Sequence, residues 1–203
     1  MTIEQRPLSA TSGAARMPSH APAVVLEVYG DPIPQGSMKP VPRKGQSYTQ
    51  LVSDNPALKP WRERVRHVAM QTQAAANLRP WTPISGPVVI AAEFYVAKPK
   101  RAPKRRRIMP DTKPDLDKLT RAICDALSAA GTYEDDARIT DLFPRVRYAE
   151  PDSALAHPWE LVVPGVRIAV WSVSPDWGDA DAPLVPFDSA TFFTDLQMQR
   201  STS

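Results

Sequence analysis

The stretch KPDLDKLTRAICDALSAAGTYEDDARI, residues 113–139, decides which fold and chemistry the sequence predicts. Apolar residues recur through it at helical steps: Leu116, Leu119, Ile123 and Leu127. Lys113 precedes a proline, which favours an extended backbone there and a helix start close to Asp115. Gly131 stands where such a helix would end. The stretch therefore predicts one amphipathic helix between two acidic segments.

Two acidic pairs flank this helix. Asp115 and Asp117 would point about 200° apart in mid-helix, so they can converge only where the helix begins. Asp135 and Asp136 follow on a short connection, and they return to the first pair if the next strand lies beside the preceding one. Such carboxylates repel one another unless a cation lies among them, and oxygen ligands suit Mg²⁺ or Mn²⁺ rather than zinc. The alternative is that Asp115 and Asp117 merely cap the helix.

A polar stripe follows the same helix at four-residue steps through Asp117, Arg121 and Asp125. One interpretation is an ordinary ladder of ion pairs. The functional interpretation places Arg121 beside a metal-bound phosphate, where it offsets the charge of the transition state. Cys124 borders this stripe, and we expect it to be a packing residue rather than a nucleophile.

Basic residues crowd the segment that leads to the helix: Lys98, Lys100, Arg101, Lys104, Arg105, Arg106 and Arg107. The region from Glu150 to Asp195 is predominantly acidic, so the charge is unevenly distributed. A second loop, within residues 31–48, carries Lys39, Arg43 and Lys44 and suits either phosphate contacts or simple solvent exposure. A carboxylate-bound metal beside a basic surface indicates phosphodiester hydrolysis in a polyanion.

The rest of the sequence predicts an α+β fold with two layers, a mixed β-sheet and two main helices. Strands are expected at residues 24–29, 88–97, 137–148 and 166–173, and the other helix at 56–77. Residues 1–22 are expected to be a disordered arm, residues 23–174 the folded domain, and residues 175–203 an extension rich in proline and aspartate.

Composition excludes several classes of protein. The 203 residues contain one cysteine and three histidines, which argues against an internal disulfide and a zinc site. No run of about eighteen apolar residues occurs, and the first twenty residues lack an apolar signal core. We therefore expect a cytoplasmic protein without a membrane span.

The quoted stretch resembles the RusA family of Holliday junction resolvases, in the segment KPDLDKLTRAICDAL, the glycine and YEDDARI. The likeness extends over residues 24–173 and includes the early segment GDPIPQGSMKP. It implies a small homodimeric α+β nuclease in which aspartates bind Mg²⁺ and each subunit nicks one strand of a four-way junction. Asp115 and Asp117 match the first two catalytic aspartates, Asp136 the third, and Asp135 its acidic neighbour.

Two positions depart from the family pattern. Arg121 stands where a catalytic lysine is common, and Lys118 where asparagine is usual. The residues expected to contact DNA are Lys39, Arg43, Lys44, Lys104, Arg105, Arg106, Arg107, Lys118, Arg145 and Arg147. The resemblance implies a resolvase of branched DNA, in the bacterial host cytoplasm if a phage encodes it. Two alternatives stay open: a nuclease acting on flaps or forks, and a junction-binding protein without activity.

Overall fold

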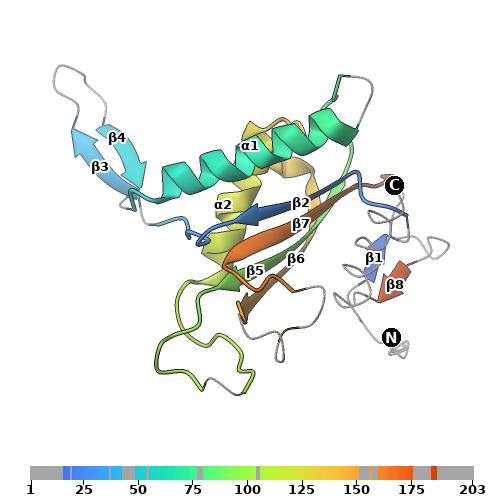
Figure 1. Ribbon diagram of the computed structural model, residues 1–203. Helices are drawn as coiled ribbons and strands as arrows, with labels where there is room; N and C mark the ends of the chain where they lie inside the picture. Colours follow the sequence, from blue (N-terminus) through green and yellow to red (C-terminus); the bar gives the residue numbers. More distant parts are fainter. Residues whose placement is uncertain are drawn as a thin grey trace, which may run out of the picture.

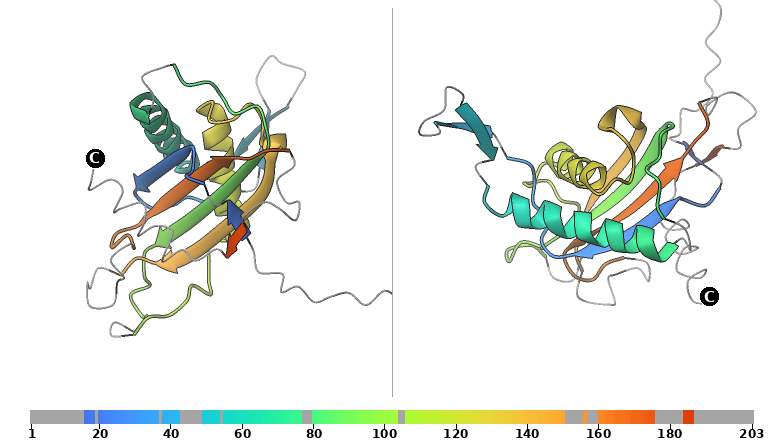
Figure 2. Two further views of the ribbon diagram at one scale, coloured as in Figure 1. Left: turned by 90° about the vertical axis from the view of Figure 1, so that its right-hand side faces the viewer. Right: turned by 90° about the horizontal axis from the view of Figure 1, so that it is seen from above.

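A four-stranded mixed sheet carries two helices on one face (Figure 1). The computed structural model describes residues 16–18, 20–36, 38–42, 49–53, 55–76, 80–103, 106–150, 156, 160–175 and 184–186. In chain order the main elements are β2 (Val24–Tyr29), α1 (Leu58–Ala76), β5 (Val88–Val96), α2 (Leu116–Ala129), a 3-10 turn η1 (Asp136–Arg138), β6 (Ile139–Tyr148) and β7 (Gly165–Ser172). Figure 2 gives two further views of the sheet and the helices, and α1 and α2 share one hydrophobic core with the sheet. The predicted two-layer α+β architecture is confirmed.

The strands lie in the order β2-β7-β5-β6. β5 and β6 are parallel, whereas β7 pairs antiparallel with both β2 and β5. β5 is buried at every position, because Ile90 and Phe94 pack beneath the helices while Val89 and Ala91 pack with Trp171 on the other face. A continuous apolar run is typical of a strand that is covered on both faces.

The helices bury one stripe each. α2 contributes Leu119, Ile123 and Leu127, all fully buried, to the core that it shares with α1 and the sheet. Gly131 ends α2 in a left-handed conformation with φ of +68°, and the amide of Thr132 donates to the carbonyl of Leu127 at 3.0 Å. This hydrogen bond and that from the Gly131 amide to Ser128 form a Schellman motif, for which glycine is the favoured residue.

Three short segments differ from the sequence-based expectation. Part of the expected long loop forms a hairpin of β3 (Met38–Pro42) and β4 (Thr49–Ser53), and its prolines are tolerated because both strands are edges. Within the expected N-terminal arm, β1 (Arg16–Pro18) pairs with β8 (Leu184–Pro186) of the expected C-terminal extension. Long-range strand pairing of this kind leaves no periodic signal in such short, proline-bearing segments.

The described residues include no helix long and apolar enough to cross a membrane.

Candidate active site

The start of α2 carries the first acidic pair. Asp115 is the N-cap residue with an extended backbone, but its side chain makes no capping hydrogen bond. Instead, its carboxylate pairs with the Lys118 ammonium at 2.7 Å, and this hydrogen bond lowers the pKa of Asp115. Asp117 lies in the first helical turn and is exposed. Asp115 is therefore held as an ion pair with one of the two residues that depart from the family pattern.

The other end of α2 carries a second group of carboxylates, which we call the α2–η1 acidic cluster: Asp125, Asp135 and Asp136. Asp135 accepts a hydrogen bond from the Ala137 amide at 2.8 Å and so caps η1. Burial raises the pKa of Asp136, and the negative charges of Asp125 and Asp135 raise it further. The Tyr133 hydroxyl and the Arg62 guanidinium act in the opposite direction. Carboxylates whose pKa is perturbed by neighbouring like charges are common at functional sites.

α1 supplies a cation to the same place. Arg62 lies 3.3 Å from the carboxylate of Asp125, and both side chains are partly exposed. Tyr133 is buried and donates its hydroxyl hydrogen to the Cys124 carbonyl at 2.9 Å. The cluster therefore comes from two consecutive elements, α2 and η1, and α1 adds Arg62 to it from a distant part of the sequence.

The two acidic groups lie toward opposite ends of α2. Asp125 follows Asp115 by ten residues, which corresponds to about 15 Å along a helix axis. β6 does lie beside β5, as expected, but the two strands are parallel, so α2 runs back across the sheet before β6 begins. Asp136 therefore lies near the C-terminal end of α2, whereas Asp115 lies at its N-terminal end. Among the described residues, no three His, Cys, Asp or Glu side chains are grouped so that they could hold a metal ion. A metal site shared by Asp115, Asp117 and Asp136 stays a prediction.

Arg121 lies between the two acidic groups. It is exposed and follows Asp117 by one helical step of four residues, as Asp125 follows Arg121. Each step is about 6 Å along the axis, so the guanidinium is placed to meet a phosphate bound near either group. The structure therefore keeps both interpretations of the stripe open.

The sequence analysis missed the contributions of Asp125, Arg62 and Tyr133. Asp125 was considered only as a member of the polar stripe, and Arg62 lies in the predicted helix at residues 56–77 without a local pattern that singles it out. Tyr133 lies in the connection after α2, beside the acidic residues that attracted attention. Nothing local in the sequence shows that α1 packs against α2 and brings Arg62 to Asp125.

Most of the chain, including both acidic groups, matches one known protein family. The family model described as "Endodeoxyribonuclease RusA" matches residues 30–156, more than half of the chain. The chain belongs to the RusA family. RusA proteins are endodeoxyribonucleases that resolve Holliday junctions, and they generally depend on a divalent metal ion. The chain is also similar to protein YqaN of Bacillus subtilis (strain 168), at 30% identity over 136 residues, which cover 63% of this chain and 89% of YqaN.

The donor set in this RusA-family chain suits a hard cation. The α2–η1 acidic cluster offers carboxylate oxygens, the ligands that Mg²⁺ and Mn²⁺ prefer. Mg²⁺ needs only one or two protein carboxylates when water and substrate phosphate complete its coordination. Cys124 borders the cluster but is buried, and burial raises the pKa of its thiol to about 12. It is therefore placed as the expected packing residue, and oxygen ligands fit the site better than sulfur.

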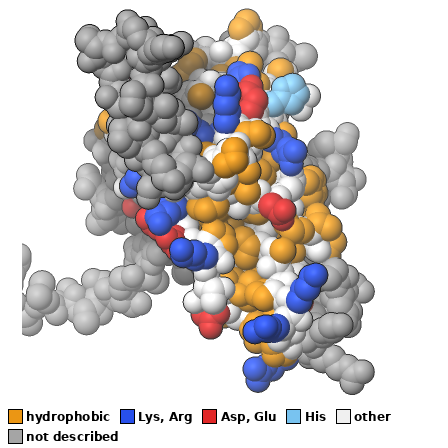
Figure 3. Space-filling model, turned by 90° about the vertical axis from the view of Figure 1, so that its left-hand side faces the viewer, with side chains coloured by type: hydrophobic (Ala, Val, Ile, Leu, Met, Phe, Trp, Pro, Cys, Tyr) orange, Lys and Arg blue, Asp and Glu red, His pale blue; other side chains and the backbone are white. Residues whose placement is uncertain are grey.

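The basic residues differ in whether an ion pair already engages them, whether they are exposed, and whether the structure describes them. Lys98 of the basic segment forms a largely buried ion pair with Glu150 at 2.8 Å, and Arg107 pairs with Glu160. Arg106 is exposed. The positions of Arg43, Lys44, Lys104 and Arg105, and the side chain of Lys39, lie outside the described residues. On the face drawn in Figure 3, Lys and Arg side chains are spread around exposed hydrophobic ones. Part of the basic segment thus stabilises the loop, and only the remainder is available to a polyanion.

Proposed function

We propose that this chain is a Mg²⁺-dependent resolvase that acts as a homodimer and cuts four-way DNA junctions by paired, symmetric nicks. Two members of the α2–η1 acidic cluster, Asp125 and Asp136, are the proposed metal-holding carboxylates of each subunit. The nuclease domain is residues 23–174, which includes the matched range 30–156. Asp115 and Asp117 are retained as proposed catalytic residues at the other end of α2.

The observation that carries this proposal is the match of residues 30–156 to the RusA family model, together with the placement of Asp125 and Asp136 at the end of α2. Asp136 is exposed, and the neighbouring charges of Asp125 and Asp135 disfavour its ionised form. A divalent cation removes that repulsion, whereas a structural ion-pair network would lower the pKa instead. Family membership supplies the chemistry to which such a site would contribute.

Each residue has a distinct proposed role. When bound, the metal ion activates a water molecule and stabilises the departing oxygen of the cleaved phosphodiester. Asp125 and Asp136 hold the ion, Arg62 keeps the Asp125 carboxylate in place, and Asp135 holds η1 through its hydrogen bond to Ala137. Arg121, on the same face of α2, stabilises the negative charge that develops on the phosphate. In this role Arg121 supplies a fixed positive charge rather than a proton.

The test is cleavage of an end-labelled synthetic four-way junction by the full chain, with Mg²⁺ and with Ca²⁺ as the control ion. We expect two nicks at symmetric positions with Mg²⁺, and junction binding without cleavage by Asp136→Asn. Faster cleavage of flaps or forks than of the four-way junction would instead identify a broader structure-specific nuclease. Junction binding with no Mg²⁺-dependent nicking would identify a binding protein without activity.

A matched pair of variants separates the two ends of α2. Asp125→Asn should raise the Mg²⁺ concentration needed for half-maximal cleavage, because it removes a proposed ligand. Asp111→Asn removes an exposed carboxylate from the loop before α2 and should cleave like the wild type. If Asp117→Asn changes the Mg²⁺ requirement while Asp125→Asn leaves it unchanged, the metal lies at the start of α2, and our assignment of the metal-holding residues is wrong.

A further inference from the structure

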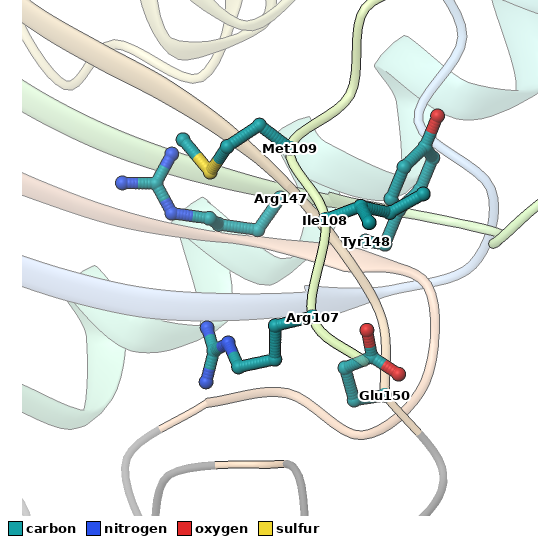
Figure 4. Close-up of a pocket in the computed structure, with 6 residues that line it drawn as sticks. All are labelled: Arg107, Ile108, Met109, Arg147, Tyr148 and Glu150. Atoms are coloured by element: carbon teal, nitrogen blue, oxygen red, sulfur yellow. The ribbon is translucent and has the colours of Figure 1, made fainter. Parts of the chain in front are cut away.

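A small pocket lies at the end of the sheet remote from the α2–η1 acidic cluster. Its volume is about 140 Å³, and it is lined by Arg107, Ile108, Met109, Arg147, Tyr148 and Glu150. One wall is the loop that carries the basic segment, and the other is the end of β6 (Figure 4). For scale, a dry cavity of about 150 Å³ accommodates benzene. The pocket is thus large enough for one small planar group.

The loop wall is anchored from two sides. Lys98 donates to the Glu150 carboxylate at 2.8 Å and to the Arg106 carbonyl at 3.0 Å, and the Lys98–Glu150 pair is largely buried. Arg107 forms a bidentate ion pair with Glu160, which lies in the segment that precedes β7. This pairing raises the pKa of Arg107, so the guanidinium stays charged. Because these ion pairs already hold the loop, binding of a ligand loses less conformational entropy than it would with a mobile loop.

The charges of this pocket favour an anion. The carboxylates of Glu150 and Glu160 are already paired with Lys98 and Arg107, which leaves Arg147 as the excess positive charge. Arg147 follows Arg145 on the same face of β6, because side chains alternate along a strand. Figure 4 shows Arg107 and Arg147 extending to the same side of the loop, with the Met109 side chain alongside Arg147. A planar guanidinium matches the geometry of a phosphate group.

The apolar lining suits a nucleoside attached to that anion. Ile108 is partly buried, whereas Met109 is 61% exposed, which is unusual for a large hydrophobic side chain. Free inorganic phosphate would gain nothing from Met109, but the sugar or base that adjoins a phosphodiester would cover it. A cationic rim with an apolar wall is therefore better suited to a nucleotide within a DNA strand than to an isolated ion.

We propose that this pocket is a second DNA-binding site, in which Arg147 contacts a backbone phosphate and Met109 contacts the adjoining nucleoside. The proposal rests on the proposed function for the identity of the polymer. Along β6, Arg147 lies eight residues beyond Ile139, or about 26 Å from the end near Asp136. That span corresponds to about eight base pairs of B-form DNA. The pocket therefore lies away from the α2–η1 acidic cluster, and we call Arg147 a binding residue rather than a catalytic one.

The test measures binding of a fluorescent four-way junction to the full chain in Ca²⁺, at several salt concentrations. Arg147→Gln should weaken binding about tenfold and reduce the slope of log affinity against log salt by about one per protomer. Arg101→Gln is the matched control, because it removes an equal charge from an exposed position in the same loop, outside the pocket lining. It should weaken binding by less than about twofold.

Met109→Ala gives an independent measurement that does not depend on charge. Because Met109 is exposed, this variant should keep the fold even if Arg147→Gln does not. It should weaken junction binding about threefold with an unchanged salt slope. Equal effects of Arg147→Gln and Arg101→Gln, together with no effect of Met109→Ala, would overturn the proposed pocket. Failure of the wild type to bind DNA in Ca²⁺ would also overturn it.

Cleavage of the same junction in Mg²⁺ distinguishes this failure from failure of the proposed function. Wild-type cleavage with no pocket effect on binding refutes the pocket and leaves the nuclease intact. A pocket effect on binding without any Mg²⁺-dependent cleavage refutes the nuclease and supports the pocket as a DNA-binding site.

Discussion

Replacing Asp136 by asparagine should have opposite effects on the free energy of unfolding in two buffers. Relative to the wild type, the variant should be more stable without metal and less stable with metal. The pKa of Asp136 is raised in the folded chain, so the ionised side chain lowers the free energy of unfolding at neutral pH. Without metal, Asp136→Asn should therefore be more stable than the wild type, by only a few tenths of a kcal/mol because the group is partly exposed. This advantage should disappear below the ordinary pKa of 3.8, where the wild-type carboxyl group is also neutral.

With metal present, the order should invert. At a metal concentration about ten times the dissociation constant, a ligand that binds only the folded state adds about 1.4 kcal/mol. For a domain of about 150 residues, that corresponds to a rise in melting temperature of about 3 to 6 °C. Wild type should show this rise with Mg²⁺ or Ca²⁺, and Asp136→Asn should lose most of it because a proposed ligand is gone.

The assay is thermal unfolding followed by circular dichroism, with and without each ion, for wild type, Asp136→Asn and the control Asp111→Asn. Asp111 is an exposed carboxylate outside both acidic groups, so its variant should keep the full metal-dependent rise. An equal rise in all three proteins would refute the reasoning, because it would show that Asp136 does not help to hold the ion. Asp117→Asn, measured in parallel, reports whether the start of α2 contributes to the same binding event.

Three further predictions concern the fold and the pH response. Leu127→Ala should lower the free energy of unfolding by about 2 to 5 kcal/mol, since Leu127 is fully buried; a loss below about 1 kcal/mol in urea titration would contradict this. Gly165→Ala should cost about 1 to 3 kcal/mol in the same measurement, because its Cβ would lie 2.6 Å from the Val28 carbonyl oxygen, and an unchanged stability would argue against the β2–β7 register. Arg62→Gln removes a charge that lowers the pKa of Asp136, so the acidic limb of the pH–cleavage profile should move to higher pH; an unmoved limb would separate Arg62 from the site.

The basic segment shows why a run of like charge is a weak guide to a binding surface. Lys98 and Arg107 are engaged by Glu150 and Glu160, two acids that follow β6 and precede β7. Both acids lie at the start of the region whose negative charge was noted in the sequence. The charge asymmetry along the chain is thus partly cancelled where the loop meets the sheet, and what remains for DNA depends on which side chains are left exposed.

The sequence by itself determined the helices, the main strands and the family, because these follow from local periodicity and from one continuous motif. The apolar steps of α2 and its terminal Gly131 are properties of neighbouring residues, and the structure places the helix where they predict it. The uninterrupted apolar run of β5 likewise predicted a strand that is covered on both faces.

The packing of the two helices sets which cation meets these acids. Asp125 lies near Asp136 across the turn that follows α2, and Arg62 pairs with Asp125 because α1 packs against α2. The direction of a strand and the partner of a helix depend on contacts between residues that are distant in the chain. Local patterns carry no record of those contacts, so they predict the acidic residues but not the ion pair between Arg62 of α1 and Asp125 of α2.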